Sequence, residues 1–504
     1  MQELSSQNIY QLFIESCKKY PQRSAIFING VSYSYAQFLN IVSNIKFQIK
    51  TQKNESGFIG VFTDEHINTY ASVWAILSTA SAYVPINKKH PVQRSKEIIN
   101  DAGIKILLYA EESIAIEELK TQLKDKIRFI RTNTVYDEAI DYSLPDIQIE
   151  NFAYLLFTSG STGKAKGVPI SHKNLMALAK AHLFHPKYNI KKEDRFLQMF
   201  ELTFDFSVLP TLFPFCVGAS VYVVPQKGIL FMEVLKTLRD HRITKAYMVP
   251  SVIHYLSPYF NEISLPDIQW SLFCGEALYE KTALGWAQCT PNGKIINTYG
   301  PTEATVFMTE YFLNPNDIES YNGIVSIGKA VQGMKCKIMD RQLQKVEKGE
   351  LYISGNQTAT HYLNNVFRST ESFINLDDGN LYYRSGDICF ENENGNLMYC
   401  GRADQQVKIN GYRIELEEIE FHAKKYLGNG DLAAFTLKNK SGANVLCMAI
   451  ARFETNENDL VQNLKKNLPL YMVPEKVFFL EKIPLNTNAK TDRIKLASLF
   501  TTLL

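Results

Sequence analysis

Residues 154–168, which read YLLFTSGSTGKAKGV, constrain this chain more than any other stretch. An apolar run of β-strand type opens there into a loop of hydroxyl and glycine residues that also contains Lys164 and Lys166. Glycines let the backbone approach an anion closely, and hydroxyls, successive N–H groups and lysines donate to phosphate oxygens. The stretch therefore predicts a cradle for a polyphosphate at the end of a buried strand.

Two other interpretations of this loop compete. A surface loop can be rich in Gly and Ser without binding a ligand. The P-loop of nucleotidases needs a glycine five residues before its Gly-Lys pair, and Ser or Thr after the lysine. This chain has Thr158 and Ala165 at those two places, so the nucleotidase pattern fails twice.

Length and composition limit the class of protein. A chain of 504 residues predicts two or more domains, and 45% hydrophobic with 21% charged residues is typical of a soluble globular protein. A net charge of +2 indicates no nucleic-acid or membrane partner, and no apolar run is long enough to span a bilayer. The 8 cysteines form no C-x-x-C pair, which argues against zinc and redox motifs. We expect a cytoplasmic monomer.

Strand and helix patterns alternate in the first part of the chain. Residues 24–38 predict a short hairpin with its turn at Asn29-Gly30, followed by a helix. Residues 57–62 predict a buried strand, and residues 70–82 predict a helix. Such alternation is typical of an α/β domain with largely parallel sheets.

Two acidic residues occur in contexts that suit ligand binding. Asp205 stands between phenylalanines, where a carboxylate is costly unless it meets a cation or strong donors. Glu303 ends the run N-T-Y-G-P-T-E, in which Tyr299 can stack on a purine, Thr302 can donate to a phosphate and the carboxylate can hold Mg²⁺. An ordinary surface aspartate and a plain Tyr-Gly-Pro turn are the alternatives.

Three histidines in the middle of the chain receive no function. Ser171 is the expected N-cap of a helix, and His172 beside it is expected to pack or to cap. His182 and His185 have i, i+3 spacing, which alone is weak grounds for a metal site.

Taken in order, these motifs resemble those of the adenylate-forming superfamily, which includes acyl-CoA synthetases, luciferases and the amino-acid-adenylating domains of nonribosomal peptide synthesis. Residues 203–208 resemble the F-D-x-S motif of the amino-acid-adenylating group, in which the aspartate holds the substrate ammonium. The likeness covers essentially the whole chain and is closest to the free-standing D-alanine–D-alanyl carrier protein ligases, which share F-C-G-E at residues 273–276. Asn410 and Ala489 stand where the family usually has Arg and Gly.

The resemblance implies an α/β fold with two domains. Residues 1–403 would form a large N-terminal α/β domain of several subdomains with mixed sheets, which holds the ATP and amino-acid sites. Residues 404–504 would form a small mobile C-terminal α+β domain. In this family pattern Asp404 is the hinge, and Lys408 and Gly411 act in the second, thiolation conformation.

ATP and Mg²⁺ are the cofactors that the resemblance implies. Glu303 would bind the metal, and Asp387 would accept hydrogen bonds from the ribose hydroxyls. The implied catalytic residues are Lys490, which bridges the substrate carboxylate and the phosphate, together with Thr158 and Lys166. The residues implied for ATP binding are Thr158, Ser159, Gly160, Ser161, Thr162, Gly163, Lys166, Asn297, Thr298, Tyr299, Gly300, Thr302, Asp387, Arg402 and Lys490.

The implied reaction activates an amino acid as aminoacyl-AMP and transfers it to the phosphopantetheine thiol of a carrier protein. The carrier is expected to be a separate protein, because the chain ends soon after Arg493. D-alanine or another small amino acid is the first candidate substrate, since large residues crowd the implied pocket. The implied substrate-binding residues are Asp205, Phe206, Leu209, Tyr247, Leu272, Cys274, Thr298, Val306 and Phe307.

Three other interpretations remain. The chain can be a stand-alone enzyme of nonribosomal-peptide type for a different amino acid. It can be an acyl-CoA synthetase, which Asp205 disfavours because such an enzyme has no substrate ammonium to bind. It can be a non-catalytic adenylate-binding protein, which the presence of Lys490, Glu303 and Asp387 disfavours.

Overall fold

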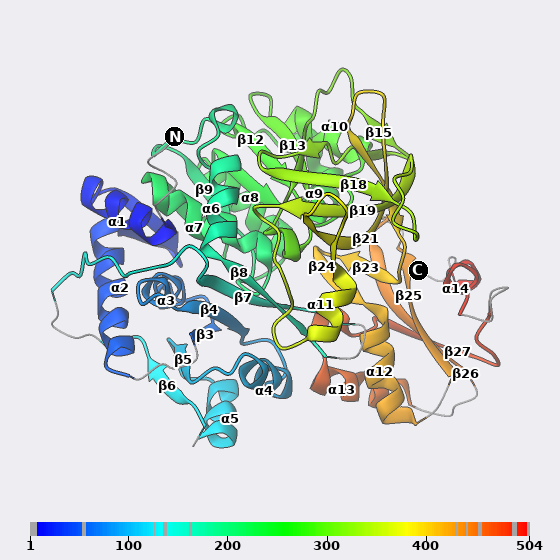
Figure 1. Cartoon of the computed structure of the whole chain (residues 1–504), viewed down its shortest axis with the longest axis horizontal. Helices are drawn as coiled ribbons and strands as arrows, with labels where there is room; N and C mark the ends of the chain where they lie inside the picture. Colours follow the sequence, from blue (N-terminus) through cyan, green and yellow to red (C-terminus); the bar gives the residue numbers. More distant parts are fainter. Residues whose placement is uncertain are drawn as a thin grey trace. The chain divides into compact units, whose positions relative to one another are not determined.

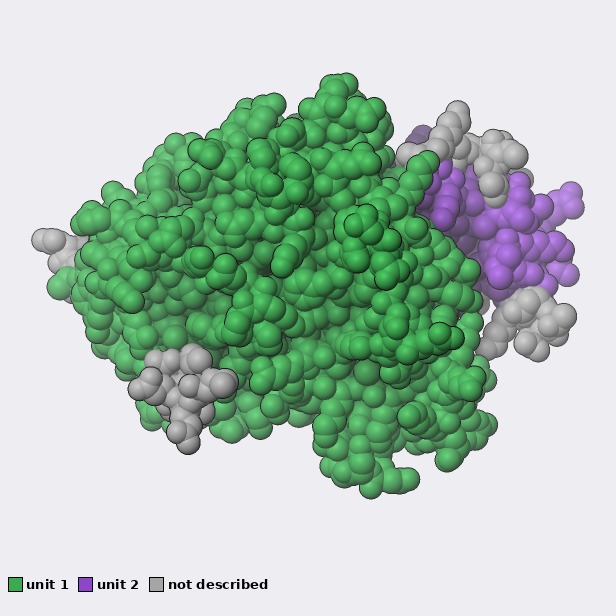
Figure 2. All heavy atoms as spheres, turned by 90° about the horizontal axis from the view of Figure 1, so that it is seen from above, with its two compact units in different colours: residues 1–88, 99–156, 167–403 green, residues 89–98, 157–166, 404–504 purple. Residues whose placement is uncertain are grey.

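The computed structural model describes residues 8–52, 57–124, 126–134, 139–160, 164–428, 431–439, 442–451, 456–485 and 491–500. These residues form the mixed α/β fold with several sheets that the sequence predicts (Figure 1). Two compact units divide the chain (Figure 2). The first is residues 1–88, 99–156 and 167–403, and the second is residues 89–98, 157–166 and 404–504. Within the described ranges, every helix is too short or too polar to cross a membrane.

The largest sheet of the first unit has nine strands, in the order β17-β14-β13-β12-β11-β9-β10-β1-β2. Its inner strands are parallel and buried, as expected where helices cover both faces of a sheet. The predicted hairpin is confirmed, since Asn29 and Gly30 take positive φ between antiparallel β1 and β2. The strands are β1 (Ser24–Ile28), β2 (Val31–Ser34), β9 (Arg195–Gln198), β10 (Ser220–Val223), β11 (Lys245–Met248), β12 (Trp270–Phe273), β13 (Lys294–Tyr299), β14 (Thr309–Phe312) and β17 (Lys329–Ala330).

A second sheet has six strands, in the order β6-β5-β3-β4-β7-β8. Helix α3 (Ile67–Leu77), which contacts this sheet, is buried on all sides and correspondingly apolar. It ends earlier than the predicted residue 82, because Ala80 has a φ of 56° and turns the chain into β4. The strands are β3 (Phe58–Thr63), β4 (Ala82–Asn87), β5 (Ile106–Tyr109), β6 (Arg128–Arg131), β7 (Phe152–Thr158) and β8 (Lys166–Ser171).

Aromatic rings join several helices of the first unit into one core. The Phe13 ring stacks on Trp74 with centroids 4.3 Å apart, and the Phe215 ring stacks on Phe38 at 4.9 Å. Ser171 caps α6 in a capping box with Asn174, as predicted. The remaining helices of the first unit are α1 (Ile9–Lys19), α2 (Tyr35–Lys50), α5 (Ile114–Leu123), α6 (His172–Ala181), α7 (Val208–Val217), α8 (Leu230–Asp240), α9 (Pro250–Leu256), α10 (Glu280–Cys289) and α11 (Val366–Ser372). Helix α4 (Val92–Asp101) lies in the second unit up to Ile98.

A smaller antiparallel sheet completes the first unit. Its order is β18-β19-β21-β20, and β22 also pairs with β21. Short helical turns and a two-stranded ribbon connect the larger elements. The sheet strands are β18 (Met334–Met339), β19 (Lys348–Gly355), β20 (Phe373–Asn375), β21 (Leu381–Glu391) and β22 (Leu397–Arg402). The ribbon is β15 (Ser320–Tyr321) and β16 (Ile324–Val325), and the 3₁₀ turns are η2 (Pro186–Tyr188), η3 (Asp205–Ser207), η4 (Ser257–Glu262) and η5 (Thr302–Ala304).

The second unit is built on a three-stranded sheet, β25-β26-β27. Side chains alternate along β25, so Leu432 and Ala434 join one apolar core with α12 and α13. Ala433 and Phe435 join another core with Leu496 of α14. Its elements are β25 (Asp431–Lys438), β26 (Asn444–Ala451), β27 (Lys476–Leu480), α12 (Leu416–Leu427), α13 (Glu457–Asn467), η6 (Leu470–Met472) and α14 (Arg493–Phe500).

A hairpin of the second unit explains one departure from the family pattern. Strands β23 (Gln406–Ile409) and β24 (Tyr412–Glu415) are joined by Asn410 and Gly411, whose φ values are 50° and 83°. A two-residue turn with both φ values positive favours Asn-Gly, because Asn tolerates this region better than Arg does. Asn410 therefore suits the turn that it occupies.

Candidate active site

The predicted phosphate loop begins where strand β7 ends, at Thr158. Gly160 is needed at its position, because a Cβ built there would lie 2.0 Å from the carbonyl oxygen of Lys164. The hydroxyl of Thr158 is buried without a hydrogen-bond partner among the described residues. Three further predicted members lie outside the described residues: Ser161, Thr162 and Gly163.

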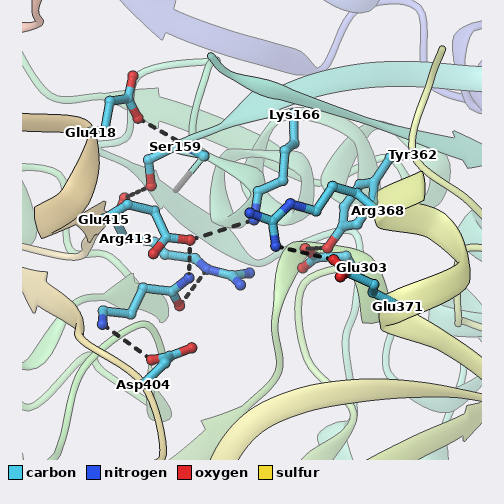
Figure 3. Close-up of polar contacts among 12 residues, drawn as sticks. Ser159, Lys166, Glu303, Tyr362, Arg368, Glu371, Asp404, Arg413, Glu415 and Glu418 are labelled. Atoms are coloured by element: carbon cyan, nitrogen blue, oxygen red, sulfur yellow. Dashed lines mark hydrogen bonds and ion pairs between the residues drawn. The ribbon is translucent and has the colours of Figure 1, made fainter. Parts of the chain in front are cut away.

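Donors of this loop are engaged by carboxylates around the start of α12 (Figure 3). The Gly160 N–H donates to Oε2 of Glu418 at 3.0 Å. The Lys166 Nζ lies 3.4 Å from Oε1 of Glu415. All four residues belong to the second unit. A carboxylate oxygen accepts from N–H donors much as a phosphate oxygen does, and Gly160 and Lys166 both contact carboxylates here. Their binding of phosphate remains a prediction.

The Glu418 carboxylate is fully buried and satisfied at both oxygens. Its Oε1 lies 2.5 Å from the guanidinium of Arg94, which is also in the second unit. Burial is the largest single influence on the pKa of Arg94 and works to lower it, but the charge and hydrogen bond of Glu418, together with smaller electrostatic contributions, make the net shift upward. Beside this pair, the Ser159 hydroxyl donates to the carbonyl oxygen of Arg413 at 2.8 Å. Ser159 and Gly160 are thus both held by residues near the start of α12.

Glu415 also belongs to a chain of hydrogen bonds that reaches the predicted hinge residue. The side-chain amide of Gln406 donates to Glu415, and the Arg413 Nε donates to Oε1 of Gln406 at 2.7 Å. The Gln406 N–H in turn donates to Oδ1 of Asp404 at 3.1 Å. The chain links Lys166 to Asp404 through Glu415 and Gln406.

Three more predicted residues belong to the second unit, namely Lys408, Gly411 and Lys490. The Lys408 carbonyl accepts from the side-chain amide of Asn444 at 3.5 Å, and Gly411 forms the hairpin turn. Lys490 lies outside the described residues. The roles assigned by resemblance to Lys490, Asp404, Lys408 and Gly411 remain predictions.

In the first unit, three of the residues predicted to bind the nucleoside come together. Tyr299 ends β13, Asp387 lies on β21 and Arg402 ends β22. The Tyr299 hydroxyl donates to Oδ2 of Asp387 at 2.5 Å, and the Arg402 guanidinium lies 3.1 Å from Oδ1. Burial raises the pKa of Tyr299 well above its usual range, so this hydroxyl keeps its proton. The arrangement presents a buried carboxylate whose charge is balanced by Arg402.

Glu303, the predicted metal ligand, lies in η5 and is fully buried. Its Oε1 accepts a hydrogen bond from the Tyr362 hydroxyl at 2.7 Å (Figure 3). Its backbone carbonyl accepts from the Ala359 N–H at 2.8 Å, which fixes the turn. Carboxylate oxygen is the ligand type that Mg²⁺ prefers, and Mg²⁺ is usually bound by one or two carboxylates together with substrate phosphates. The chemistry of this residue therefore fits the implied metal.

The remaining members of the N-T-Y-G-P-T-E run have structural contacts of their own. The Asn297 amide donates to the carbonyl of Ser326 at 2.9 Å, and the Thr298 hydroxyl donates to the carbonyl of Phe273 at 2.9 Å. A Cβ on Gly300 would lie 2.5 Å from the Cα of Phe307. Thr302 opens η5. The run is therefore packed closely against its neighbours.

Asp205 opens η3 and is buried among aromatic side chains, with 8% of its surface exposed. The ring of Phe206 beside it lies 4.7 Å from that of Phe200, and the rings of Phe200 and Phe204 are 5.6 Å apart. Burial raises the pKa of Tyr154 well above its usual range, and the charge of Asp205 adds to this shift. A carboxylate with so little exposed surface stays ionised only where cations or hydrogen-bond donors compensate for the lost hydration.

The residues predicted to line the amino-acid pocket are all buried in the first unit. The rings of Phe206 and Tyr247 meet edge to face with centroids 5.9 Å apart, and Cys274 Sγ lies 3.9 Å from the carbonyl oxygen of Val306. These contacts bring together the ends of β11 and β12 and the stretch after η5. The full set, none more than 3% exposed, is Phe206, Leu209, Tyr247, Leu272, Cys274, Thr298, Val306 and Phe307.

Sequence reasoning missed that His182 contacts two of the residues predicted to line the amino-acid pocket. This residue follows α6, and its Nε2 lies 2.7 Å from the Tyr247 hydroxyl. Its ring centroid lies 5.4 Å from that of Phe307. His185, in contrast, caps η2, and His172 is buried in the core, where it was expected to pack or to cap. The spacing of His182 and His185 gave no signal for this difference, because only the fold brings residues 182, 247 and 307 together.

Comparison with known proteins places the chain among nucleotide-dependent enzymes. Residues 13–363 match the family described as AMP-binding enzyme. Gramicidin S synthase 2 of Brevibacillus brevis is 29% identical over 498 residues, which cover 97% of this chain and 11% of that protein. Gramicidin S synthase 1 of the same organism is 28% identical over 498 residues, which cover 97% of this chain and 44% of that protein. The chain spans between 7% and 44% of the length of the curated relatives that it matches first.

Two solved structures share the fold. The Vibrio cholerae adenylation domain AlmE, in complex with glycyl-adenosine-5'-phosphate, gives a TM-score of 0.85 at 24% identity, with 98% of each chain covered. Holo-PA1221, an NRPS protein containing adenylation and PCP domains bound to a vinylsulfonamide inhibitor, gives 0.84 at 23% identity, covering 97% of this chain and 84% of that one.

Proposed function

Because the chain belongs to the family of AMP-binding enzymes, an adenylate-forming family, we propose that it activates an amino acid with ATP and Mg²⁺ as an aminoacyl-adenylate. The observation that carries the amino-acid assignment is Asp205, a buried carboxylate among phenylalanine rings. An aspartate there suits an ammonium group, whereas a fatty or aromatic acid offers no cation to balance it. D-alanine or another small amino acid is the proposed substrate.

In the proposed adenylation step, the carboxylate of the amino acid attacks the α-phosphorus of ATP. A new C–O–P linkage forms, the bond between the α-phosphorus and its bridging oxygen breaks, and pyrophosphate leaves with that electron pair. Asp387 would accept from the ribose hydroxyls, while Arg402 and Tyr299 keep its carboxylate in place. Thr158, Ser159, Gly160 and Lys166, with Ser161, Thr162 and Gly163, would donate to the phosphates.

These residues would act mainly by stabilising charge, because reactions at phosphorus need positioning and electrostatic stabilisation rather than covalent bonds to the protein. Glu303 would hold Mg²⁺, which when bound neutralises charge on the phosphate oxygens. Tyr362 orients the Glu303 carboxylate through its hydroxyl. Lys490 would bridge the substrate carboxylate and the phosphate, as the family pattern implies.

In a proposed second step, the thiol of a carrier protein's phosphopantetheine attacks the acyl carbon of the adenylate. A thioester forms, the acyl–phosphate C–O bond breaks, AMP leaves with that electron pair and the proton of the thiol passes to solvent. The division into residues 1–403 and 404–504, with Asp404 as hinge and Lys408 and Gly411 acting in this step, is part of the proposal. The similarity to an NRPS protein that contains both adenylation and PCP domains supports a carrier as acceptor.

The test is amino-acid-dependent exchange of labelled pyrophosphate into ATP. Wild type should respond to one or more small amino acids and much less to the matching acids without an amino group. In Asp205→Asn, affinity for the amino acid should fall by about 30-fold or more, because a buried ammonium loses its charged partner. The affinity of the variant for the matching acid without an amino group should fall much less, and its affinity for ATP should hardly change.

Exchange measured with both acids in both proteins shows whether Asp205 binds the substrate ammonium or has only a structural role. If Asp205→Asn weakens both acids alike, then Asp205 is structural and the amino-acid assignment loses its support. If acetate or a fatty acid supports exchange and no amino acid does, the protein is an acid-activating ligase of another type.

A further inference from the structure

His182 is a fully buried histidine that has no part in the proposed chemistry. Burial is the main cause that lowers its pKa to about 3, and the charges of Lys187 and Lys245 add to this. The ring is therefore neutral at any pH at which the enzyme works. A neutral imidazole in this place can accept or donate hydrogen bonds and can pack, but it brings no charge to the site.

Two of the three largest residues of the proposed pocket contact His182. Its Nε2 lies 2.7 Å from the Tyr247 hydroxyl, and the two rings meet edge to face. The Phe307 ring lies 5.4 Å from the imidazole, also edge to face. The third large residue, Phe206, packs edge to face on Tyr247. His182 thus contacts Tyr247 and Phe307 directly and reaches Phe206 through Tyr247.

The hydrogen bond fixes where the Tyr247 ring points. A tyrosine hydroxyl that is fully buried must find a partner, and within the described part of the chain His182 supplies it. The imidazole itself is held by rings on its other sides, with Tyr188 at 4.2 Å and Trp270 at 5.8 Å. Because both partners are held, Tyr247 cannot rotate away to make room for a longer substrate side chain.

We propose that His182 is a specificity-positioning residue. It bonds the Tyr247 hydroxyl so that Tyr247, Phe206 and Phe307 close the floor of the pocket, which then takes an amino acid with a hydrogen atom or a methyl group as its side chain. The inference rests on the proposed function and narrows its substrate class to glycine and alanine. His182 acts only through Tyr247 and Phe307 and touches no reacting atom.

The test compares variants that keep or remove the hydrogen bond. His182→Leu keeps much of the volume without the bond, His182→Gln offers an amide that can restore it, and Tyr247→Phe keeps the ring but removes the hydroxyl. The double variant His182→Leu/Tyr247→Phe completes a cycle. Exchange of pyrophosphate is measured for glycine, alanine, valine and leucine, together with the KM for ATP and the thermal midpoint of unfolding.

We expect wild type to prefer glycine or alanine. His182→Leu and Tyr247→Phe should each lower the preference for alanine over leucine by about tenfold, through KM for the amino acid rather than kcat. In the double variant this preference should fall by about the same factor as in either single variant, since both substitutions remove the same hydrogen bond. His182→Gln should recover most of the preference, and the KM for ATP should stay the same.

Several results would overturn the proposal. If all folded variants keep the wild-type preference, His182 is a packing residue only. Additive losses in the double variant would show that the bond does not carry the effect. A wild type that prefers leucine refutes the closed floor and the proposal of a small amino acid as substrate, while the adenylation of an amino acid stands. If no amino acid supports exchange, the proposed function fails and this inference falls with it.

Discussion

Two arginine–carboxylate pairs, one in each unit, hold a buried carboxylate between an arginine and a second donor. In the first unit Arg402 neutralises Asp387, whose other oxygen accepts from Tyr299. In the second unit Arg94 neutralises Glu418, whose other oxygen accepts from the N–H of Gly160. The pairs use the same chemistry, but the partner of the second oxygen differs.

This difference sets what each region can offer a ligand. Asp387 is a hydrogen-bond acceptor held ready by its neighbours, which suits sugar hydroxyls. In the second unit the acceptors are Glu418 and Glu415, and they occupy the very donors, Gly160 and Lys166, that phosphate oxygens would need. Under the proposed function, a carboxylate would help the nucleotide in the first region and would compete with its phosphates in the second. Removing the charge should therefore have opposite effects.

The largest effect is expected for Asp387→Asn. The variant loses the charged acceptor proposed for the ribose and leaves Arg402 without its buried partner. A hydrogen bond to a charged group contributes about 1.5–3 kcal/mol, so ATP affinity should fall by roughly tenfold or more. Fluorescence titration with ATP or equilibrium dialysis measures this affinity directly.

A matched control is Asp267→Asn, because Asp267 pairs with Arg242 in the same unit but on the surface. Exposed pairs contribute little, and this variant should bind ATP like wild type. An Asp387→Asn protein that is well folded and binds ATP normally would remove Asp387 from the nucleotide site.

A smaller effect of opposite sign is expected for Glu415→Gln and Glu418→Gln. Each variant weakens the hold on Lys166 or Gly160, so the triphosphate has less to displace. A net hydrogen bond of about 1 kcal/mol predicts about fivefold tighter ATP binding. AMP, which has a single phosphate, should gain less than ATP, and a titration with both nucleotides measures the ratio.

Glu420→Gln is the matched control for these two variants. Glu420 lies on α12 as well, but its carboxylate pairs with Arg493 and accepts from the N–H of Ala434. Neither of these partners belongs to the phosphate loop. The control variant should leave ATP binding unchanged. Equal tightening in all three variants would point to a general loss of negative charge, and weaker binding in Glu415→Gln would mean that Glu415 helps the nucleotide rather than competing with it.

Structural features that depend on a few neighbouring residues could be predicted from the sequence alone. The loop glycines, the hairpin at Asn29-Gly30 and the Ser171 cap depend on neighbours within a few residues, and the structure bears out the hairpin and the cap. The mixed α/β class also followed from the alternation of strand and helix patterns. Helix α3 shows the limit of such predictions, because an apolar stretch gives no sign that Ala80 will leave the helix.

Long-range contacts could not be predicted in the same way. The bond between His182 and Tyr247 joins residues 65 positions apart, and the contact of Gly160 with Glu418 joins residues 258 positions apart. A lone histidine or an acidic helix start is compatible with many surroundings. The resemblance could name Asp387 and Arg402 because a family motif contains them, but it says nothing of residues that act only through others.

The last prediction concerns the acid sensitivity of the first unit rather than the binding of the nucleotide. His172 is buried in the first unit, and burial lowers its pKa to about 4 from the ordinary value of 6.5. Between these two values the unfolded chain binds a proton that the folded chain does not. Stability contributed by the neutral ring is therefore complete above pH 6.5 and is lost as the pH falls toward 4. At pH 5 the loss is about 2 kcal/mol relative to pH 7.5.

His172→Gln removes this titration, so its free energy of unfolding should fall less between pH 7.5 and pH 5 than that of wild type. Urea unfolding followed by tryptophan fluorescence reports on the first unit alone, because all 3 tryptophans, Trp74, Trp270 and Trp286, belong to it. The partly buried His361 gives the control variant His361→Gln. If His172→Gln and wild type lose the same stability over this range, the His172 ring is already hydrated or protonated in the folded protein, and the acid sensitivity of the first unit has another origin.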